Sequence, residues 1–391
     1  MLTVPNLLAR GGTKLRMIFA PLDIPFSRTF HALQALFSHY DIPAEFIAER
    51  LHSVTHSFGW HQNADSNYVC WLHFLCKNIE VVRDKHGIPS IQDPRGTNMS
   101  QDDGTWLRSG YFLRWKQPHS ASGGDGMVEF VIFSPSPSLK ANLTSLVPSP
   151  DWEETLIDPF CLLSIVLEDM FRQVDAAIRG VLQVFRPIEH SVLQFAYHGA
   201  TASQFDFVGI HNIAKHIIYL KESSSAACST ANHICEHHRD LMTQPQRAHA
   251  SELMRSVHGL LQHKLSLLEG CRLRVQSMES RAQNAINLAF NTANQQASKI
   301  LKSDSQSMKV IAMMTLLFLP VASVASICGS QFFNFDVDSR KILVSTDFGI
   351  FWATTIPLTL IVLVTYGLWQ WLRERSLIIF ARIQSSRKSA A

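Results

Sequence analysis

The sequence predicts an α+β soluble domain, followed by a long stalk helix and two C-terminal transmembrane α-helices. Three observations predict this fold class. The C-terminal part contains two long apolar runs without a charged residue. A proline-free segment with helical periodicity precedes the first of these runs. Before that segment, strand-like and helix-like stretches alternate with loops rich in Ser, Gly and Pro.

Composition separates the C-terminal part from the rest of the chain. Of the 391 residues, 17% are charged, which is below the roughly 25% usual for soluble domains. Mean hydropathy is +0.05, and residues 1–309 read as ordinary soluble sequence, so the apolar excess lies beyond them. The net charge of +3 shows no strong electrostatic bias, and we therefore expect no nucleic-acid partner.

Residues 1–240 predict a mixed α/β domain. The N-terminus is basic and has no acid before Asp23, which is typical of a weak mitochondrial presequence or of an irregular start before a strand at Leu15–Ala20. Further strands are predicted at residues 67–79, 106–115 and 127–133. Helices are predicted at residues 26–37, 43–57 and 158–188, and loops at residues 117–126 and 134–150.

Two kinds of chemical site receive little support. The seven cysteines show no framework spacing, so reduced thiols in a reducing compartment are the simplest interpretation. One loose cluster comprises Cys228, His233, Cys235, His237 and His238, but zinc sites usually show tighter paired spacing. No Gly-rich phosphate loop, nucleophile elbow or HExxH motif occurs, so we expect neither an enzyme nor a bound cofactor.

Residues 246–309 predict the stalk helix. This segment contains no proline and only two glycines, Gly259 and Gly270, and its apolar residues recur at three- and four-residue steps. At 1.5 Å per residue the helix is about 95 Å long. Because a free helix of this length is not stable alone, it must pack on itself, on the N-terminal domain or on copies of itself.

Residues 310–328 and 348–372 predict the two transmembrane helices. The first run has 19 uncharged residues and the second has 25. Nineteen helical residues span about 28 Å, close to the roughly 30 Å of a bilayer core, and the longer run spans it with tilt. Trp352 near one end, with Trp369 and Trp371 near the other, suits interfacial belts. The alternative is a pair of buried core helices in a soluble protein.

Basic residues near the spans predict the orientation, because cytoplasmic flanks carry an excess of Lys and Arg. The residues concerned are Lys299, Lys302 and Lys309 before the first span, and Arg373, Arg375, Arg382, Arg387 and Lys388 in the tail at 373–391. The connecting segment at 329–347 contains only Arg340 and Lys341 beside three aspartates. Both termini are therefore expected in the cytoplasm, or in the matrix if the protein is mitochondrial.

Several segments resemble one known family. Residues 307–336, SMKVIAMMTLLFLPVASVASICGSQFFNFD, are similar to the first membrane helix and filter of CorA-type magnesium channels. The segments at 48–60 (AERLHSVTHSFGW), 71–80 (WLHFLCKNIE), 185–189 (FRPIE) and 284–296 (NAINLAFNTANQQ) resemble the fungal branch of CorA-like proteins. The order of domain, stalk, pore helix, short outer loop, second helix and basic tail is also the same.

This resemblance implies a homopentamer in the lipid bilayer that passively conducts divalent cations, with Mg²⁺ as the transported ion. In the family, magnesium bound between cytoplasmic domains closes the pore. The family's filter is Gly-Met-Asn, whereas this chain has Gly329, Ser330 and Gln331. Gln331, the metal-facing residue by this resemblance, keeps an amide oxygen that can accept hydrogen bonds from a hydrated ion. The added methylene and the loss of Met favour altered selectivity, weaker conduction or none.

The resemblance also assigns a pore face to the first span. At helical spacing this face carries Met308, Ala312, Thr315, Leu319, Ala322 and Ser326 and leads toward Gln331. A seam between the two membrane helices has the same pattern. Asp336 and Asp338 of the outer loop are either acids that concentrate cations at the mouth or members of a solvated loop.

Two functional hypotheses therefore stay open. The first is the CorA-type magnesium channel. The second is a non-conducting membrane scaffold or regulatory paralogue that keeps the fold and mixes with intact paralogous subunits. The filter at Gly329, Ser330 and Gln331 is the feature that favours the second.

Overall fold

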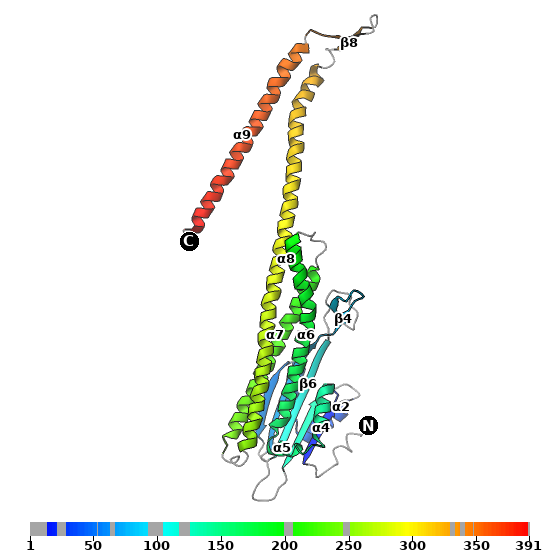
Figure 1. The fold of residues 1–391 in the computed structure, drawn as a ribbon, viewed down its shortest axis with the longest axis vertical. Helices are drawn as coiled ribbons and strands as arrows, with labels where there is room; N and C mark the ends of the chain where they lie inside the picture. Colours follow the sequence, from blue (N-terminus) through cyan, green and yellow to red (C-terminus); the bar gives the residue numbers. More distant parts are fainter. Residues whose placement is uncertain are drawn as a thin grey trace. The chain divides into compact units, whose positions relative to one another are not determined.

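The computed structural model describes residues 14–21, 29–52, 54–62, 67–92, 105–116, 126–198, 206–244, 251–328, 333–336, 341–346 and 348–389. The chain divides into two compact units, residues 1–293 and 294–391 (Figure 1). The segment before Lys14, to which the presequence hypothesis applies, lies outside the described residues.

The first unit is built on a five-stranded sheet with the order β1-β7-β6-β3-β2. The strands are β1 (Leu15–Ala20), β2 (Ser57–Gln62), β3 (Asn67–Asn78), β6 (Thr105–Lys116) and β7 (Met127–Phe133). β1 pairs with β7 in parallel, and the other neighbours are antiparallel. The strand alternative for the N-terminal segment and the strands predicted within residues 67–133 are confirmed.

Both faces of the sheet are covered, because successive side chains of a strand point to opposite sides. On one face Phe74 is fully buried in the larger core, together with residues of the long helices. On the other face Trp71 packs against α2 (Phe30–Tyr40) and α3 (Ala44–Leu51), where Phe46 is fully buried. β3 is therefore apolar along most of its length and buried on both faces of the sheet.

A short hairpin of β4 (Val81–Arg83) and β5 (Pro89–Ile91) forms a separate two-stranded sheet. Asp84 shapes its turn, because Asp84 Oδ1 accepts hydrogen bonds from the backbone N–H groups of His86 and Ile88, each at 2.8 Å. Gly87 has a φ of 78°, a conformation that glycine adopts without the steric penalty of a side chain.

Three long helices complete the first unit: α6 (Phe160–His198), α7 (Phe207–Met242) and the first part of α8 (Ser251–Cys328). They lie side by side along the sheet (Figure 1). The buried stripe of α8 recurs at three-, four- and seven-residue steps, which is the spacing of one helix face. Its buried residues in this unit are Met254, Val257, Leu261, Leu268, Cys271, Val275, Met278, Ala282, Ala285 and Ala289.

The prediction of a loop over residues 134–150 is wrong, because α4 (Pro137–Leu146) lies within it. Ser136 caps this helix by accepting a hydrogen bond from the N–H of Leu139 at 3.0 Å, and proline occupies the first helical position. Ser followed by Pro is a helix start signal, but it was obscured by the Ser- and Pro-rich composition. A further short helix, α5 (Trp152–Ile157), follows.

Helices elsewhere in the first unit also differ from the predictions. α6 does not end near Pro187 but continues to His198, because Val192 and Phe195 are buried beyond the proline. The helix predicted at 43–57 ends at Leu51. α7 was not predicted, since its mixture of Ser, Ala and His gives it only a weak amphipathic pattern.

The second unit contains the remainder of α8, a two-stranded hairpin and α9 (Phe348–Ser389). The hairpin pairs β8 (Phe333–Asp336) with β9 (Lys341–Val344) in antiparallel register. α8 ends at Cys328 and α9 begins at Phe348, the same residues that bound the two predicted spans. α9 remains helical beyond the second predicted span, as far as Ser389 in the basic tail.

Candidate functional site

The six predicted pore residues all lie on one uninterrupted stretch of α8. Met308 is 70% exposed and Leu319 is 63% exposed. Ala312, Thr315, Ala322 and Ser326 are exposed as well. With about 100° of rotation per residue, the six side chains fall within an arc of about 80°. The structure thus places them on one face of one helix.

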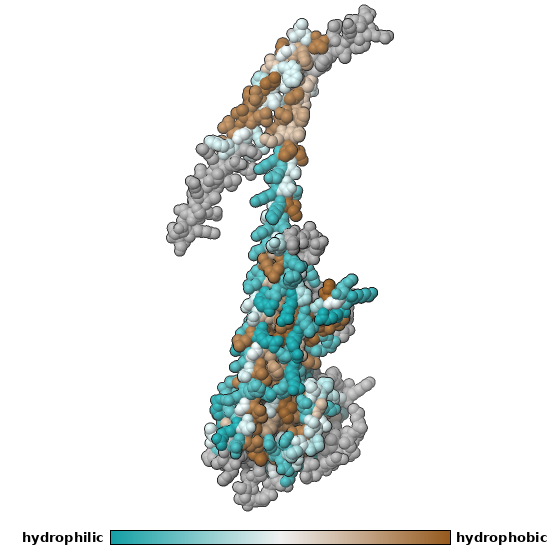
Figure 2. Space-filling view, in the orientation of Figure 1, coloured by the Kyte–Doolittle hydropathy of each residue, from teal (hydrophilic) through white to brown (hydrophobic). Residues whose placement is uncertain are grey.

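The rest of this helix surface is also apolar and exposed, both beside the pore face (Ile311 and Phe318) and opposite it (Met313). Ile311, Met313 and Phe318 are each more than half exposed, and Figure 2 shows hydrophobic side chains along the end of α8 and the start of α9. Two hydroxyl groups of this span are satisfied within the helix. Thr315 Oγ1 donates to the carbonyl of Ile311 at 2.6 Å, and Ser323 Oγ donates to the carbonyl of Leu319 at 2.8 Å.

Two helices are long and apolar enough to cross a membrane, one within Glu252–Ser326 and one at Phe348–Trp369. Only 6% of each apolar window is buried within the chain, whereas the core helix of a soluble protein is mostly buried. Leaving one large apolar side chain in water costs about 1.5–3 kcal/mol relative to burying it. These windows therefore require cover from lipid or from another protein chain.

The hydroxyl groups of α9 follow the rule for helices in an apolar environment, where every polar group needs an internal partner. Thr355 Oγ1 donates to the carbonyl of Phe351 at 2.7 Å, and Thr359 Oγ1 donates to the carbonyl of Thr355 at 2.8 Å. Thr365 Oγ1 makes the same kind of bond to Ile361 at 2.9 Å. The threonines of this span therefore expose no unsatisfied donor.

The filter residues Gly329, Ser330 and Gln331 lie outside the described residues, as does Asp338. Asp336 is the last residue of β8 and stands opposite Lys341 in the hairpin register. The structure therefore brings the pore-face residues together on α8, but it does not place the filter.

Sequence reasoning missed a ladder of ion pairs that fixes α8 to α6. Lys264 Nζ lies 2.6 Å from Glu168 Oε2, and Arg274 Nη1 lies 2.5 Å from Asp175 Oδ1. Further along both helices, Arg281 pairs with Glu189. The three acids fall at intervals of 7 and 14 residues, which is a helix-face signal, but the partner helix cannot be read from spacing alone.

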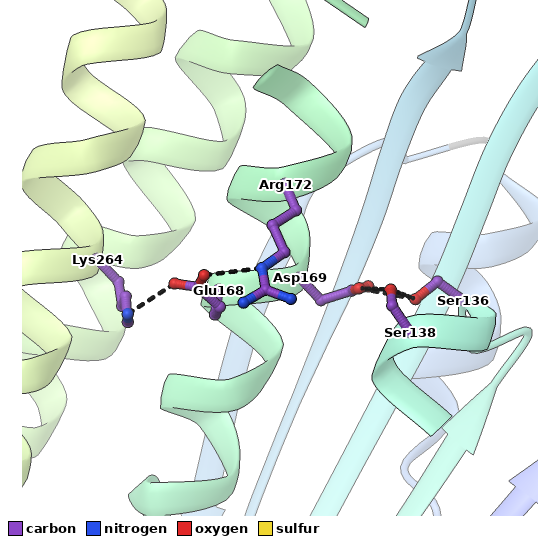
Figure 3. Close-up of polar contacts among 6 residues, drawn as sticks. All are labelled: Ser136, Ser138, Glu168, Asp169, Arg172 and Lys264. Carbon is purple, nitrogen blue, oxygen red and sulfur yellow. Dashed lines mark hydrogen bonds and ion pairs between the residues drawn. The ribbon is translucent and has the colours of Figure 1, made fainter. Parts of the chain in front are cut away.

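Glu168 is the hub of this ladder, since it also accepts a hydrogen bond from Arg172 Nε at 2.9 Å (Figure 3). Partial burial alone raises the pKa of Glu168, but the hydrogen bonds from Lys264 and Arg172 outweigh it and hold the pKa below its ordinary value. Glu189 in turn raises the pKa of Arg281 by accepting its hydrogen bonds.

Next to Glu168, the buried carboxylate of Asp169 forms a second group of hydrogen bonds. Asp169 is 1% exposed, and its Oδ1 accepts hydrogen bonds from Ser136 Oγ and Ser138 Oγ, each at 2.7 Å (Figure 3). Its Oδ2 accepts from Gln173 Nε2 at 2.7 Å. Three donors satisfy this buried carboxylate, so α4 is anchored to α6 through it.

The loose Cys/His cluster of the sequence lies on α7, with Cys228, Cys235, His237 and His238 buried. Within the described part of the chain, no group of three His, Cys, Asp or Glu side chains is placed to hold a metal ion. His238 instead contacts Asp158 and His258. His238, from the Cys/His cluster, therefore forms a buried polar contact of α7 with Asp158 and with α8.

Comparison with known proteins does not show the family to which this chain belongs. No protein-family model matches the chain. A curated relative, the notoamide biosynthesis cluster protein M' of Aspergillus versicolor, is 29% identical over 165 residues, which is 39% of this chain and 35% of that protein's length. The CorA magnesium transporter of Methanocaldococcus jannaschii aligns over 90% of this chain and 89% of its own, with a TM-score of 0.33 and 11% identity. A TM-score this low does not establish a common fold.

Proposed function

We propose that this chain is one subunit of an oligomeric membrane pore that passively conducts divalent cations, with Mg²⁺ as the cargo. The observation that carries the proposal is the course of α8. This helix is packed in the core of the first unit as far as Ala289 and then continues without a break into a charge-free run that the chain itself leaves exposed.

An exposed apolar run of this length is stable only when lipid or other copies of the chain cover it. Two membrane helices are too few to enclose a pore, so conduction requires several subunits around a common axis. The pore face of Met308, Ala312, Thr315, Leu319, Ala322 and Ser326 suits this arrangement, because it combines small residues with bulky apolar ones. A homopentamer is the assembly that the family resemblance implies.

The proposed filter uses amide oxygen chemistry. Mg²⁺ gives up its water shell reluctantly, so a ring of neutral oxygens that accept hydrogen bonds from bound water suits a hydrated ion. Gln331 supplies such an oxygen from each subunit, and Asp336 and Asp338 would raise the local cation concentration outside it. The basic flanks of the two spans favour an orientation with both termini on the cytoplasmic side.

The test is Mg²⁺ uptake in cells that lack their own magnesium transport, with expression in the membrane checked for every variant. Uptake by the natural chain supports the channel. The double change Ser330→Met with Gln331→Asn restores the filter of the resembled family, and uptake only in this variant assigns an intact pore with a disabled filter. The matched control makes the same exchanges off the pore face, at Ser307→Met with Gln306→Asn, and should leave uptake unchanged.

A second function is favoured by one observation, the Ser330-Gln331 pair where the resembled family has Met-Asn. In this alternative the chain is a non-conducting scaffold or regulatory subunit that mixes with paralogous channel subunits. Absence of uptake from both the natural chain and the filter-restored variant, with both present in the membrane, would overturn the channel proposal and leave this one.

A further inference from the structure

Three titratable side chains form a continuous chain across the first unit. Asp158 lies just before α6, His238 lies on α7 and His258 lies on α8. His238 Nε2 is 2.8 Å from Asp158 Oδ2, and His238 Nδ1 is 3.3 Å from His258 Nδ1. The side chains of Asp158 and His238 are fully buried, whereas His258 is partly exposed.

The inner end of this chain is fixed. Asp158 Oδ1 accepts a hydrogen bond from the N–H of Phe160 at 3.1 Å, which caps the start of α6. The ring of Phe160 packs against His238 with 4.9 Å between centroids. These contacts hold the carboxylate and the His238 ring in place, so we expect any adjustment at His258, which is partly exposed, and at the helix that carries it.

The number of protons on His238 and His258 decides whether the contact between the two rings can form. Asp158 Oδ2 accepts from His238 Nε2–H, so a neutral His238 has a bare Nδ1 that accepts a hydrogen bond from His258 Nδ1–H. One added proton on either ring still leaves one donor facing one acceptor, and the carboxylate balances its charge. When both rings are cationic, both Nδ1 atoms carry hydrogen, two donors face each other, and the contact must open.

We propose that Asp158, His238 and His258 act as a proton-operated clamp, which holds the first part of α8 against α7 until both histidines are protonated. The clamp itself does not depend on the function proposed above.

The surroundings oppose the second proton. Burial lowers the pKa of His258, and the positive charges of His238 and Arg239 on α7 lower it further, with only Asp158 acting in the opposite direction. Glu154 of α5 and Cys161 of α6 lie near Asp158, and His237 stacks on Trp60 of β2. When His258 is released, its pKa returns to the ordinary value of about 6.5. The open state therefore binds the proton more tightly than the closed state, and acid favours release of α8 from α7.

The experiment is hydrogen exchange of the full chain in mild detergent, followed by mass spectrometry of peptides covering residues 251–262. Protection is compared at pH 7.5 and pH 5.0 after correction for the intrinsic pH dependence of exchange. We expect about a fivefold fall in protection at pH 5.0, equivalent to one buried hydrogen bond of about 1 kcal/mol. An unchanged protection in the natural chain would overturn the clamp.

Variants separate the clamp from general acid sensitivity. His258→Gln can still donate to His238 but cannot titrate, so the fall should disappear, and persistence of the fall would refute the idea. His263→Gln removes an exposed histidine on the same helix and should behave as the natural chain does.

Asp158→Asn keeps an acceptor oxygen but loses the negative charge that balances the first added proton, so release of α8 should move to higher pH. A shift to lower pH, or none, would contradict the clamp even if the His258 variant is open at both pH values.

Hydrogen exchange of residues 251–262 is measured in detergent and does not require ion conduction. A chain that conducts no Mg²⁺ can still show the clamp, and a conducting chain can lack it. Failure of the clamp and failure of the proposed function are therefore distinguishable.

Discussion

Glu168 is predicted to stabilise the contact between α8 and α6 through its charge. It accepts from Lys264 on one side and from Arg172 on the other. The perturbation is Glu168→Gln, which keeps the size of the side chain and removes its charge. Lys264, whose side chain is 19% exposed, then loses its anionic partner.

The expected loss of stability in Glu168→Gln follows from its contacts with Lys264 and Arg172. A hydrogen bond to a charged group contributes about 1.5–3 kcal/mol when buried, and partial exposure places the Lys264 contact near the lower end, at about 1.5 kcal/mol. The Arg172 side chain is 56% exposed, so its pair contributes only about 0.3–0.5 kcal/mol. The two contributions sum to about 2 kcal/mol, and at about 2 °C per kcal/mol for a unit of this size we expect a melting temperature about 4 °C lower in Glu168→Gln.

The assay is thermal unfolding of the full chain in detergent, with Arg172→Met as the matched control and a cycle that includes Lys264→Met. The lowered pKa of Glu168 means that its contribution is present above the ordinary carboxyl value and is lost as pH falls through the folded-state value. The difference between natural chain and variant should therefore vanish in strong acid. A coupling between Glu168 and Lys264 near zero at pH 7, or a difference that persists in acid, would refute the reasoning.

Three further predictions follow from single sites. Gly59→Ala should destabilise the first unit by about 1–3 kcal/mol, because the added Cβ would lie 2.3 Å from the ring of Trp71, its register partner, and denaturant unfolding measures this. Ser136→Ala should cost about 1–2 kcal/mol in the same assay, because Ser136 both caps α4 and donates to a buried carboxylate. Asp338→Cys should react with an impermeant maleimide on intact cells, whereas Ser303→Cys should react only after permeabilisation.

Each of these predictions has a control or a contrary result. Gly259→Ala places a Cβ in open space on α8 and should not destabilise the chain. Ser145→Ala removes a hydroxyl whose bond is to its own helix and should cost less than the Ser136 change. Labelling of the Ser303→Cys variant from outside would contradict the proposed orientation.

The parts of the fold that sequence predicts well are those in which one local pattern dominates. Residues 310–328 and 348–372 have no charged side chain, so their character does not depend on any neighbour. The strand at 67–79 carries Tyr68, Val69, Trp71 and Phe74, residue types that are enriched in strands. Where patterns compete, as at Pro187 or in the Ser-rich segment that contains α4, tertiary burial decided the outcome.

The sequence by itself determined that two helices suit a membrane, that a long helix leads into the first of them, and which side chains of that helix share a face. These properties follow from composition and from a period of 3.6 residues, which are local. Only the tertiary structure decided which charges meet. Glu168 finds Lys264, and Asp158 finds His238, across separations of 96 and 80 residues. Chain packing sets these pairs, because hydrogen bonds depend on distance in space and not on distance along the chain.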